Sequence, residues 1–168
     1  SKGELVFDVR SPGEYNHAHL PKAISLPLFS DEERKIVGTT YKQQSREAAI
    51  KIGLDIFGPK MKGMIDDVEE LSKKHTNKEI NRATGKETFF DAQAPNPISI
   101  RPQPPTLFLY CWRGGMRSAG VAWLLDLYGF KVFTLAGGYK AFRNHVLQVF
   151  ELDFELKILG GYTGSGKT

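Results

Sequence analysis

The single cysteine of this chain lies in the segment LYCWRGGMRSAGVAWLL, and this segment constrains the fold more than any other part of the sequence. Residues 106–110 form an apolar run typical of a buried strand, and residues 118–128 carry apolar side chains at helical spacing. Cys111 would therefore stand at the carboxyl end of a strand, where open α/β sheets place their ligand sites. We expect a functional site at this cysteine.

The residues after Cys111 predict a loop that binds an anion and activates the thiol. Two glycines let the loop curl so that backbone N–H groups point inward, and the following helix adds partial positive charge at its N-terminus. These surroundings favour a nucleophilic thiolate, and they would equally stabilise a bound oxyanion, a persulfide or a perselenide. The predicted site consists of Cys111 as the nucleophile and of Trp112, Arg113, Gly114, Gly115, Met116, Arg117 and Ser118 as the donor-binding loop.

Strand-like and helix-like segments alternate along the rest of the chain. We expect strands at residues 5–9, 24–28, 106–110, 131–135 and 156–159, and helices within residues 31–75, 118–128 and 139–150. Such alternation favours an α/β fold whose mostly parallel sheet is covered by helices on both faces. Residues 1–150 would form this domain, with a helical and proline-rich insertion at residues 31–105. Residues 76–105 hold five prolines and no periodicity, so we expect a partly disordered surface segment there.

Residues 151–168 predict the start of a second domain. GYTGSGKT matches the phosphate-binding loop G-x-x-x-x-G-K-T and follows the strand-like ELKILG, which is the context this motif requires. Its backbone N–H groups and lysine would hold phosphates, and its threonine would bind Mg²⁺. The chain ends before the helix that should follow, so we expect a piece of a longer protein, with this loop inactive and no metal site. The predicted phosphate-binding residues are Gly161, Gly164, Gly166, Lys167 and Thr168.

Composition narrows the classes of protein. No apolar run approaches the roughly 20 residues that cross a bilayer, so we expect no membrane partner. One cysteine cannot form an internal disulfide, which suits a reducing intracellular compartment such as the cytoplasm. The net charge of +4 permits an anionic partner such as RNA without requiring one.

Three segments together resemble the rhodanese superfamily. The first is FDVRSPGEYNHAHLPKAISLPL, with matches at Asp8, Val9, Arg10, Glu14, Tyr15, His19, Pro21 and Ala23; the others are the loop CWRGGMRSAG and the closing turn LAGGYKAF. Arg10 and Glu14 could instead form a local structural ion pair. Five residues separate Cys111 from Arg117, whereas common rhodaneses have four. Rhodanese-fold phosphatases and arsenate reductases share the longer loop, which fits a tetrahedral oxyanion.

Within that superfamily the chain resembles the tRNA 2-selenouridine synthases. The resemblance rests on the loop form Cys-x-Arg-Gly-Gly-x-Arg-Ser, on the P-loop that follows the rhodanese unit, and on a helical segment. The matching residues of that segment are Glu33, Arg34, Val37, Gly38, Thr39, Tyr41, Lys42 and Gln43.

The resemblance implies a transferase that replaces sulfur by selenium in the wobble 2-thiouridine of tRNA. Selenophosphate would be the selenium donor, geranyl diphosphate a further donor, and the tRNA anticodon region the partner. Cys111 would attack or receive the chalcogen, and Arg113 and Arg117 would bind the phosphate of the donor. Lys140 and Arg143 could meet the RNA backbone or be ordinary solvated charges.

Three alternatives stay open on the sequence. The chain could be a generic sulfurtransferase or persulfide carrier, a Cys-x5-Arg phosphatase or arsenate reductase, or a regulatory binding module without catalysis. The paired glycines of the loop and the P-loop argue against a phosphatase. The intact Cys111 argues against a binding module, which does not need the nucleophile.

Overall fold

Four parallel strands form the centre of the protein, of which the computed structural model describes residues 4–84, 106–153 and 160. The strands are β1 (Glu4–Asp8), β2 (Ile24–Ser25), β3 (Thr106–Tyr110) and β4 (Val132–Thr134), in the order β2-β1-β3-β4. Asp8 pairs with Tyr110, so β1 and β3 end side by side. The predicted parallel sheet is confirmed in this part of the chain.

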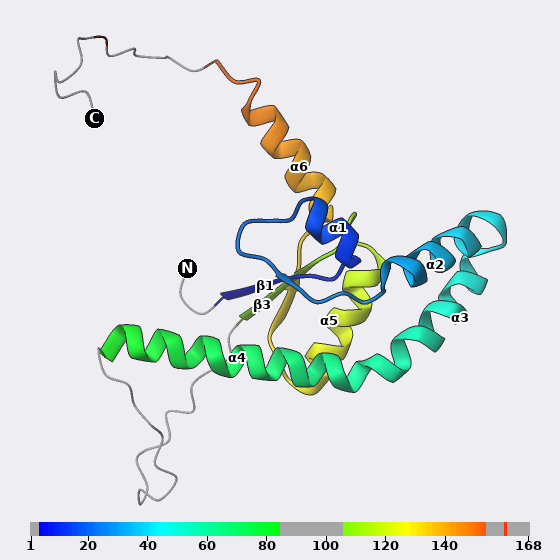
Figure 1. Cartoon of the computed structure of the whole chain (residues 1–168), viewed down its shortest axis with the longest axis horizontal. Helices are drawn as coiled ribbons and strands as arrows, with labels where there is room; N and C mark the ends of the chain where they lie inside the picture. The colour runs from blue at the N-terminus through cyan, green and yellow to red at the C-terminus, as the bar shows by residue number, and fades with distance from the viewer. Residues whose placement is uncertain (1–3, 85–105, 154–159, 161–168) are drawn as a thin grey trace, which may run out of the picture.

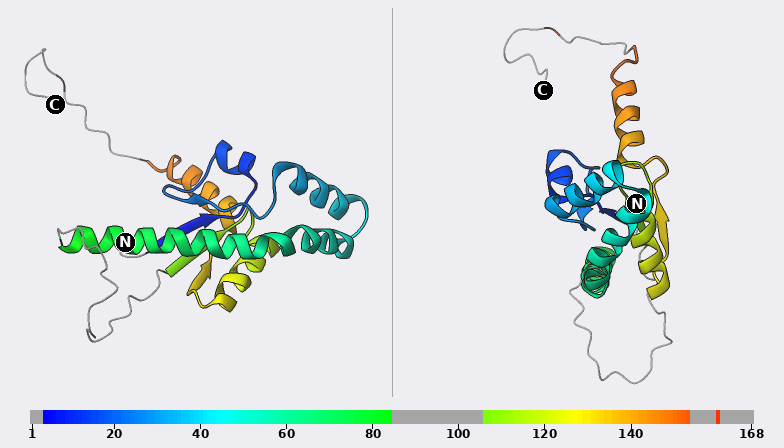
Figure 2. Two further views of the ribbon diagram at one scale, coloured as in Figure 1. Left: turned by 60° about the horizontal axis from the view of Figure 1, so that its bottom comes forward. Right: turned by 90° about the vertical axis from the view of Figure 1, so that its right-hand side faces the viewer.

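Helices cover both faces of this sheet, as the alternation predicts (Figures 1 and 2). They are α1 (Pro12–His17), α2 (Asp31–Gln43), α3 (Arg46–Phe57), the short 3-10 turn η1 (Gly58–Lys60), α4 (Met61–Thr84), α5 (Met116–Tyr128) and α6 (Gly138–Val149). Helices α3, α4 and α5 pack on the face that carries the main core, whereas α1 and α6 contribute to a smaller cluster on the opposite face.

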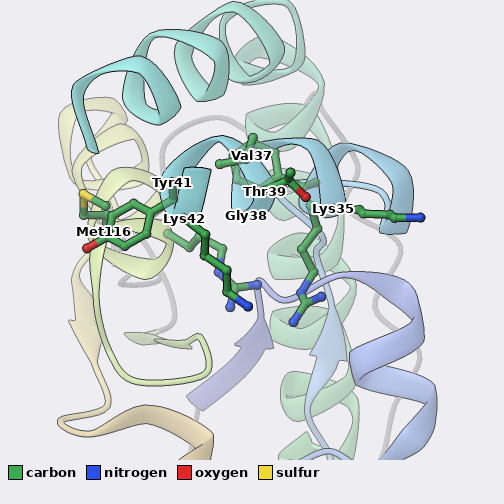
Figure 3. Close-up of a pocket in the computed structure, with 10 residues that line it drawn as sticks. Lys35, Val37, Gly38, Thr39, Tyr41, Lys42 and Met116 are labelled. Atoms are coloured by element: carbon green, nitrogen blue, oxygen red, sulfur yellow. The ribbon is translucent and has the colours of Figure 1, made fainter. Parts of the chain in front are cut away.

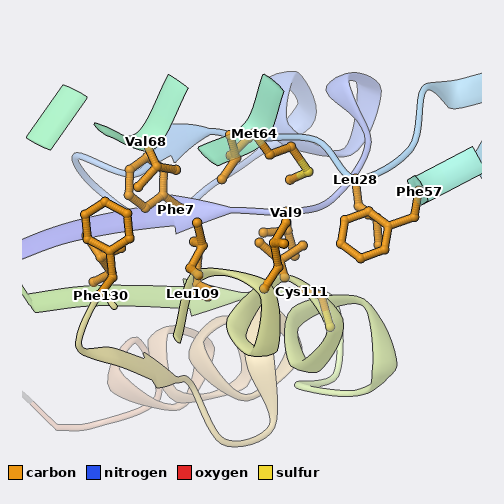
Figure 4. Packing of buried hydrophobic residues seen from close by; sticks show 14 of the residues in the cluster. Phe7, Val9, Leu28, Phe57, Met64, Val68, Leu109, Cys111 and Phe130 are labelled. Carbon is orange, nitrogen blue, oxygen red and sulfur yellow. The ribbon is translucent and has the colours of Figure 1, made fainter. Parts of the chain in front are cut away.

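The main core follows from the two-residue period of the strands. Leu5, Phe7 and Val9 alternate with residues that face the other way, and all three are buried in one cluster. Figure 4 shows Phe7 and Val9 packed against Met64 and Val68 of α4. A buried side chain of this size stabilises the fold by about 1.5–3 kcal/mol relative to exposure, so this face supplies most of the hydrophobic stabilisation.

The insertion begins with a helical hairpin of α2 and α3, which extends from one end of the molecule (Figure 1). Ser30 caps α2 because its Oγ accepts a hydrogen bond from Glu33 N at 3.2 Å while its own N donates to Glu33 Oε2 at 2.7 Å. Ser45 caps α3 in the same way by accepting from Ala48 N at 3.1 Å. The helices expected from residue 31 onward are therefore confirmed for α2 and α3.

Helix α4 is longer than the sequence suggested. We expected the irregular segment to begin at residue 76, but α4 continues to Thr84. Residues 76–84 contain neither proline nor glycine, and the first proline of the segment stands only at position 95, so nothing in the local sequence stops the helix. Residues 85–105, the expected strand at 156–159 and the P-loop glycines, lysine and threonine at 161–168 lie outside the described residues.

The strand order creates a switch point at the carboxyl ends of β1 and β3. From β1 the chain moves to β2 on one side, and it later returns to β3 on the other side of β1. Ligands of open α/β sheets bind in the crevice at such a point, because the flanking connections diverge there. The turn from Arg10 to Glu14 follows β1, and Cys111 follows β3, so both reach this position.

Candidate functional site

Cys111 follows β3 directly, and its side chain is turned into the start of α5. Gly115 N donates a hydrogen bond to the Cys111 Sγ at 3.2 Å, and the Ser118 Oγ lies 3.3 Å from the same sulfur. The thiol is buried, with 3% of the residue exposed, and belongs to the edge of the main core. The predicted order of strand, cysteine, glycine loop and helix is confirmed, and it places the sulfur at a helix N-terminus.

Two left-handed glycines hold the loop in shape. Gly114 has φ +65°, and a Cβ built there would lie 2.7 Å from the Leu135 carbonyl oxygen. Gly138 has φ +58°, and a Cβ there would lie 2.3 Å from the Cys111 carbonyl oxygen. That same oxygen accepts a hydrogen bond from Tyr139 N at 2.9 Å. The cysteine loop therefore rests directly on the turn between β4 and α6, and side chains at these glycines would separate the two.

The surroundings of the sulfur favour the thiolate. Burial by itself raises the pKa of Cys111, but hydrogen bonds from the Ser118 hydroxyl and from the backbone N–H groups of Ser118, Gly115 and Arg113 outweigh it. The net pKa of Cys111 lies below that of an ordinary cysteine. A lowered pKa at a helix N-terminus is the setting of reactive cysteines rather than of inert core thiols.

Glu14 links the cysteine loop to two other elements. Its Oε2 lies 2.8 Å from Arg117 Nη1 and 2.9 Å from Arg34 Nε, and it accepts a hydrogen bond from Ser11 N at 3.2 Å. Burial tends to raise the pKa of Glu14, but these partners hold the pKa below its ordinary value, so the carboxylate stays ionised. Glu14 is thus the anion that balances Arg117 at the start of α5.

The possible ion pair between Arg10 and Glu14 does not form. Arg10 pairs with Asp8 instead, at 2.5 Å between Nη2 and Oδ2, and donates to the Ala18 carbonyl oxygen at 2.7 Å. Its guanidinium also lies 4.1 Å from the centre of the Tyr139 ring. Arg10 is 1% exposed and its carboxylate partner is 0% exposed, so this pair is a structural element beneath the site.

Two hollows flank the cysteine loop. The first, called here the basic cleft, lies between α2 and the start of α5, has a volume of about 470 Å³, and is lined among others by Arg34, Lys35, Tyr41, Lys42, Met116 and Arg117 (Figure 3). The second, the Trp112 hollow, has a volume of about 510 Å³ and is lined among others by Trp112, Tyr139, Arg143, His17 and Arg34. The start of the cysteine loop, at Trp112, and its end, at Met116 and Arg117, thus line different cavities.

A third, apolar hollow adjoins the basic cleft. Its volume is about 280 Å³, and Phe29, Val37, Tyr41, Met116 and Arg117 line both cavities. The rest of its lining is apolar and comes mainly from α3 and α5.

Each predicted loop residue has a definite place in the structure. Ser118 is buried beside the sulfur, Arg113 is exposed, Trp112 is 36% exposed in its hollow, and Met116 and Arg117 border the basic cleft.

Residue-by-residue reasoning missed the partnership of Glu14 with Arg117 and the position of α2 beside the loop. The sequence did indicate the position of α2 indirectly. Its residues that resemble the tRNA 2-selenouridine synthases include Arg34, Tyr41 and Lys42, and all three line the basic cleft.

The described residues hold no cluster of three or more histidine, cysteine, aspartate or glutamate side chains that could bind a metal ion. Among these same residues, no helix has the length and apolar character needed to cross a bilayer. The groups assembled around Cys111 are hydrogen-bond donors and cations, which suit an anionic ligand.

Comparison with known proteins identifies relatives over nearly the whole chain. Residues 1–145 match the family model described as a rhodanese-like domain. A tRNA 2-selenouridine synthase from Shewanella denitrificans is 38% identical over 167 residues, which cover 97% of this chain and 38% of the relative. The synthase of the same name from Pseudomonas putida is 35% identical with the same coverage. The chain therefore spans less than two fifths of the length of these relatives.

A solved structure agrees with these matches. It is the N-terminal domain of a protein described as ATP/GTP binding, from Clostridium difficile 630. The two chains share 34% sequence identity with a TM-score of 0.66, and the match covers 86% of this chain and 90% of the other.

Proposed function

This chain belongs to the rhodanese-like domain family, and we propose on that basis that it is the chalcogen-transfer domain of an enzyme that replaces sulfur by selenium in the wobble 2-thiouridine of tRNA. The observation that carries the proposal is the Cys111 sulfur, 3.2 Å from Gly115 N and 3.3 Å from the Ser118 hydroxyl at the start of α5. The relatives named tRNA 2-selenouridine synthase support the choice of tRNA and selenium.

The loop suits a sulfur transfer step with a sulfane donor. The Cys111 thiolate attacks the outer sulfur of thiosulfate, the sulfur–sulfur bond breaks, and sulfite leaves with the bonding electron pair. Cys111 is left as a persulfide, whose terminal anion the Gly115 N–H and the helix N-terminus would stabilise. This step needs no further oxidant or reductant.

Selenophosphate requires a different first step, because its selenium is already at the oxidation level of selenide. Attack of the Cys111 thiolate on phosphorus breaks the phosphorus–selenium bond, and selenide leaves with the electron pair. The phosphorylated cysteine is then hydrolysed by water to phosphate. The five residues between Cys111 and Arg117 favour this route, since a loop of that length accommodates a tetrahedral phosphoryl group. The released selenide attacks C2 of 2-thiouridine, and the original sulfur leaves as sulfide.

Geranyl diphosphate fits the proposal as a second donor. The apolar hollow of about 280 Å³ beside the loop offers space for an isoprenoid chain. Titration of the chain with geranyl diphosphate should raise its Tm, and inorganic diphosphate at equal concentration should not. An equal shift with both compounds would show that only the phosphates bind.

The decisive test uses the protein in its full natural length. It is incubated with selenophosphate and tRNA that contains 2-thiouridine, and the digested tRNA is analysed for 2-selenouridine by mass spectrometry, with Cys111→Ser in parallel. The proposal predicts product with the wild type alone. If neither protein forms 2-selenouridine while thiosulfate still converts Cys111 to a persulfide, the chain is a generic sulfurtransferase. Hydrolysis of phosphate esters without selenium chemistry would instead favour the phosphatase alternative.

A further inference from the structure

We propose that the basic cleft binds the phosphate backbone of the RNA and guides the target nucleotide to Cys111. This inference rests on the proposed function and adds a specific binding surface to it. The cleft lies between α2 and the start of α5 (Figure 3), and the cations that line it are Arg34, Lys35, Lys42 and Arg117.

The cleft carries an excess of positive charge. Its four cations are opposed by Glu14, which pairs with Arg34 and Arg117 and leaves a net charge of about +3 at the cleft. In the part of the chain that the structure describes, neither Lys35 nor Lys42 has a carboxylate within ion-pair distance. The whole chain has a net charge of only +4, so the cleft concentrates much of this excess.

The acidic residues of α2 do not cancel this charge, because they are engaged at its first turn. Asp31 accepts hydrogen bonds from Gly13 N at 3.0–3.1 Å, Glu32 accepts one from the Ser30 hydroxyl at 2.9 Å, and Glu33 pairs with Lys60. The carboxylates of α2 therefore form no ion pair with Lys35 or Lys42 at the cleft. Arg46 at the start of α3 adds a further cation at the rim, with its Nη2 3.9 Å from the Met116 Sδ.

The surface of the cleft also suits a nucleic acid in shape. Lys35 and Lys42 are seven positions apart along α2, or about 10 Å of helix rise, which is enough to reach different phosphates of one strand. Gly38 has no side chain and an open surface above it, so a backbone can approach α2 closely there. Tyr41 is 53% exposed and lies beside Met116, where its ring can stack with a base (Figure 3).

The cleft lies next to the loop that carries the thiol. Arg117 borders the cleft, and the next residue, Ser118, lies 3.3 Å from the Cys111 Sγ. A strand held by its phosphates in the cleft would therefore present a neighbouring nucleotide to the loop. An acidic peptide could satisfy the charges, but an exposed aromatic ring beside them is typical of sites where unpaired RNA bases stack, and the relatives are named for a tRNA reaction.

The test compares tRNA binding by the wild type and by the double variant Lys35→Ala/Lys42→Ala over a series of salt concentrations, with fluorescence anisotropy of labelled tRNA. The control is Lys73→Ala/Lys74→Ala, which removes the same charge from the exposed face of α4. We expect the cleft variant to lose on the order of tenfold in affinity for tRNA. The slope of the logarithm of the binding constant against the logarithm of the salt concentration should fall in magnitude by about 1.4, or about 0.7 for each lost phosphate contact to a single strand. The control should stay within about threefold of the wild type.

Three outcomes would overturn the inference. The first is equal binding by the cleft variant and the wild type, and the second is an equal loss in the control, which would indicate only general charge. The third is displacement of tRNA by polyglutamate at equal charge concentration, which would assign the cleft to acidic polypeptides. Persulfide formation at Cys111 from thiosulfate, measured on the same samples, separates the two proposals. If the wild type forms the persulfide but does not bind tRNA, the assignment of tRNA as the substrate in the proposed function is wrong as well.

Discussion

Removal of the Ser118 hydroxyl should make Cys111 much less reactive near neutral pH. The Ser118 Oγ lies 3.3 Å from the Cys111 Sγ in a fully buried position, and its hydrogen bond is the strongest contribution that lowers the pKa of Cys111. A hydrogen bond to a charged group contributes about 1.5–3 kcal/mol, so Ser118→Ala should reduce the thiolate population about 10- to 150-fold at a pH below the pKa. A more basic thiolate is also more nucleophilic, which restores about half of this loss on a logarithmic scale. The net loss of reaction rate is therefore about 3- to 12-fold.

The assay is the rate of Cys111 alkylation by iodoacetamide from pH 5 to pH 10, followed by mass spectrometry of the intact chain. Because the pKa of Cys111 is lowered in the wild type and rises in the variant, the two rates should differ most at low pH. They should converge or cross above both pKa values, where each thiol is fully ionised. The matched control is Ser72→Ala, which removes a buried hydroxyl without a hydrogen-bond partner in the described residues.

The reasoning would be refuted by superimposable pH profiles of Ser118→Ala and the wild type. The Ser118 Oγ also lies 3.1 Å from the Gly115 carbonyl oxygen, so that outcome would mean that the hydroxyl hydrogen is donated there and not to sulfur. A lower Tm in Ser118→Ala than in Ser72→Ala, with unchanged alkylation, would assign the serine a purely structural role.

Two further variants test the support of the loop. Glu14→Gln should destabilise the fold by about 1–3 kcal/mol at neutral pH, because it weakens the pairing with Arg117. Since the pKa of Glu14 is lowered in the folded state, this difference in Tm should shrink as the pH falls below the unfolded pKa and vanish below the folded one; a pH-independent difference would contradict the role of its charge. Gly138→Ala should lower both Tm and the alkylation rate of Cys111, because the new Cβ would meet the Cys111 carbonyl oxygen at 2.3 Å in a left-handed backbone. Gly63→Ala, in the first turn of α4 directly after η1 and with open space around it, should instead raise stability by about 0.5–1 kcal/mol, and equal behaviour of the two glycine variants would refute the close contact.

The sequence predicted the cysteine loop well because its signals are local. A strand, a nucleophile, two glycines and a helix follow one another within about twenty residues, and each has its own pattern of side chains. The end of α4 was missed for the opposite reason, since low hydrophobicity after residue 75 resembles a loop although no residue breaks the helix there. Pro95 is the first proline after α4, and in sequence it stands beyond the end of this helix, so it does not interrupt residues 76–84.

The contacts that complete the site depend on topology, which periodicity does not reveal. Glu14 and Arg117 are 103 residues apart in sequence, and they meet because β1 and β3 are neighbours that end side by side. The pairing of Arg10 with Glu14 that sequence proximity suggested does not form, because each of the two has another partner. Arg10 reaches back to Asp8 beneath the sheet end, and Glu14 turns outward to the helix that begins after Cys111.

The position of Glu14 also explains how an inserted helix becomes part of the site. Its carboxylate accepts from Ser11 N, which fixes the start of α1, and it pairs with Arg117 of α5 and with Arg34 of α2. A single partly buried charge therefore ties the inserted hairpin to the loop that carries the nucleophile. The hydrogen bonds that Asp31 accepts from Gly13 N join α2 to α1, and the Arg34–Glu14 pair adds a directional contact that reaches the cysteine loop. The electrostatic link gives the cleft a fixed orientation toward Cys111, which is what a surface that positions one nucleotide for reaction requires.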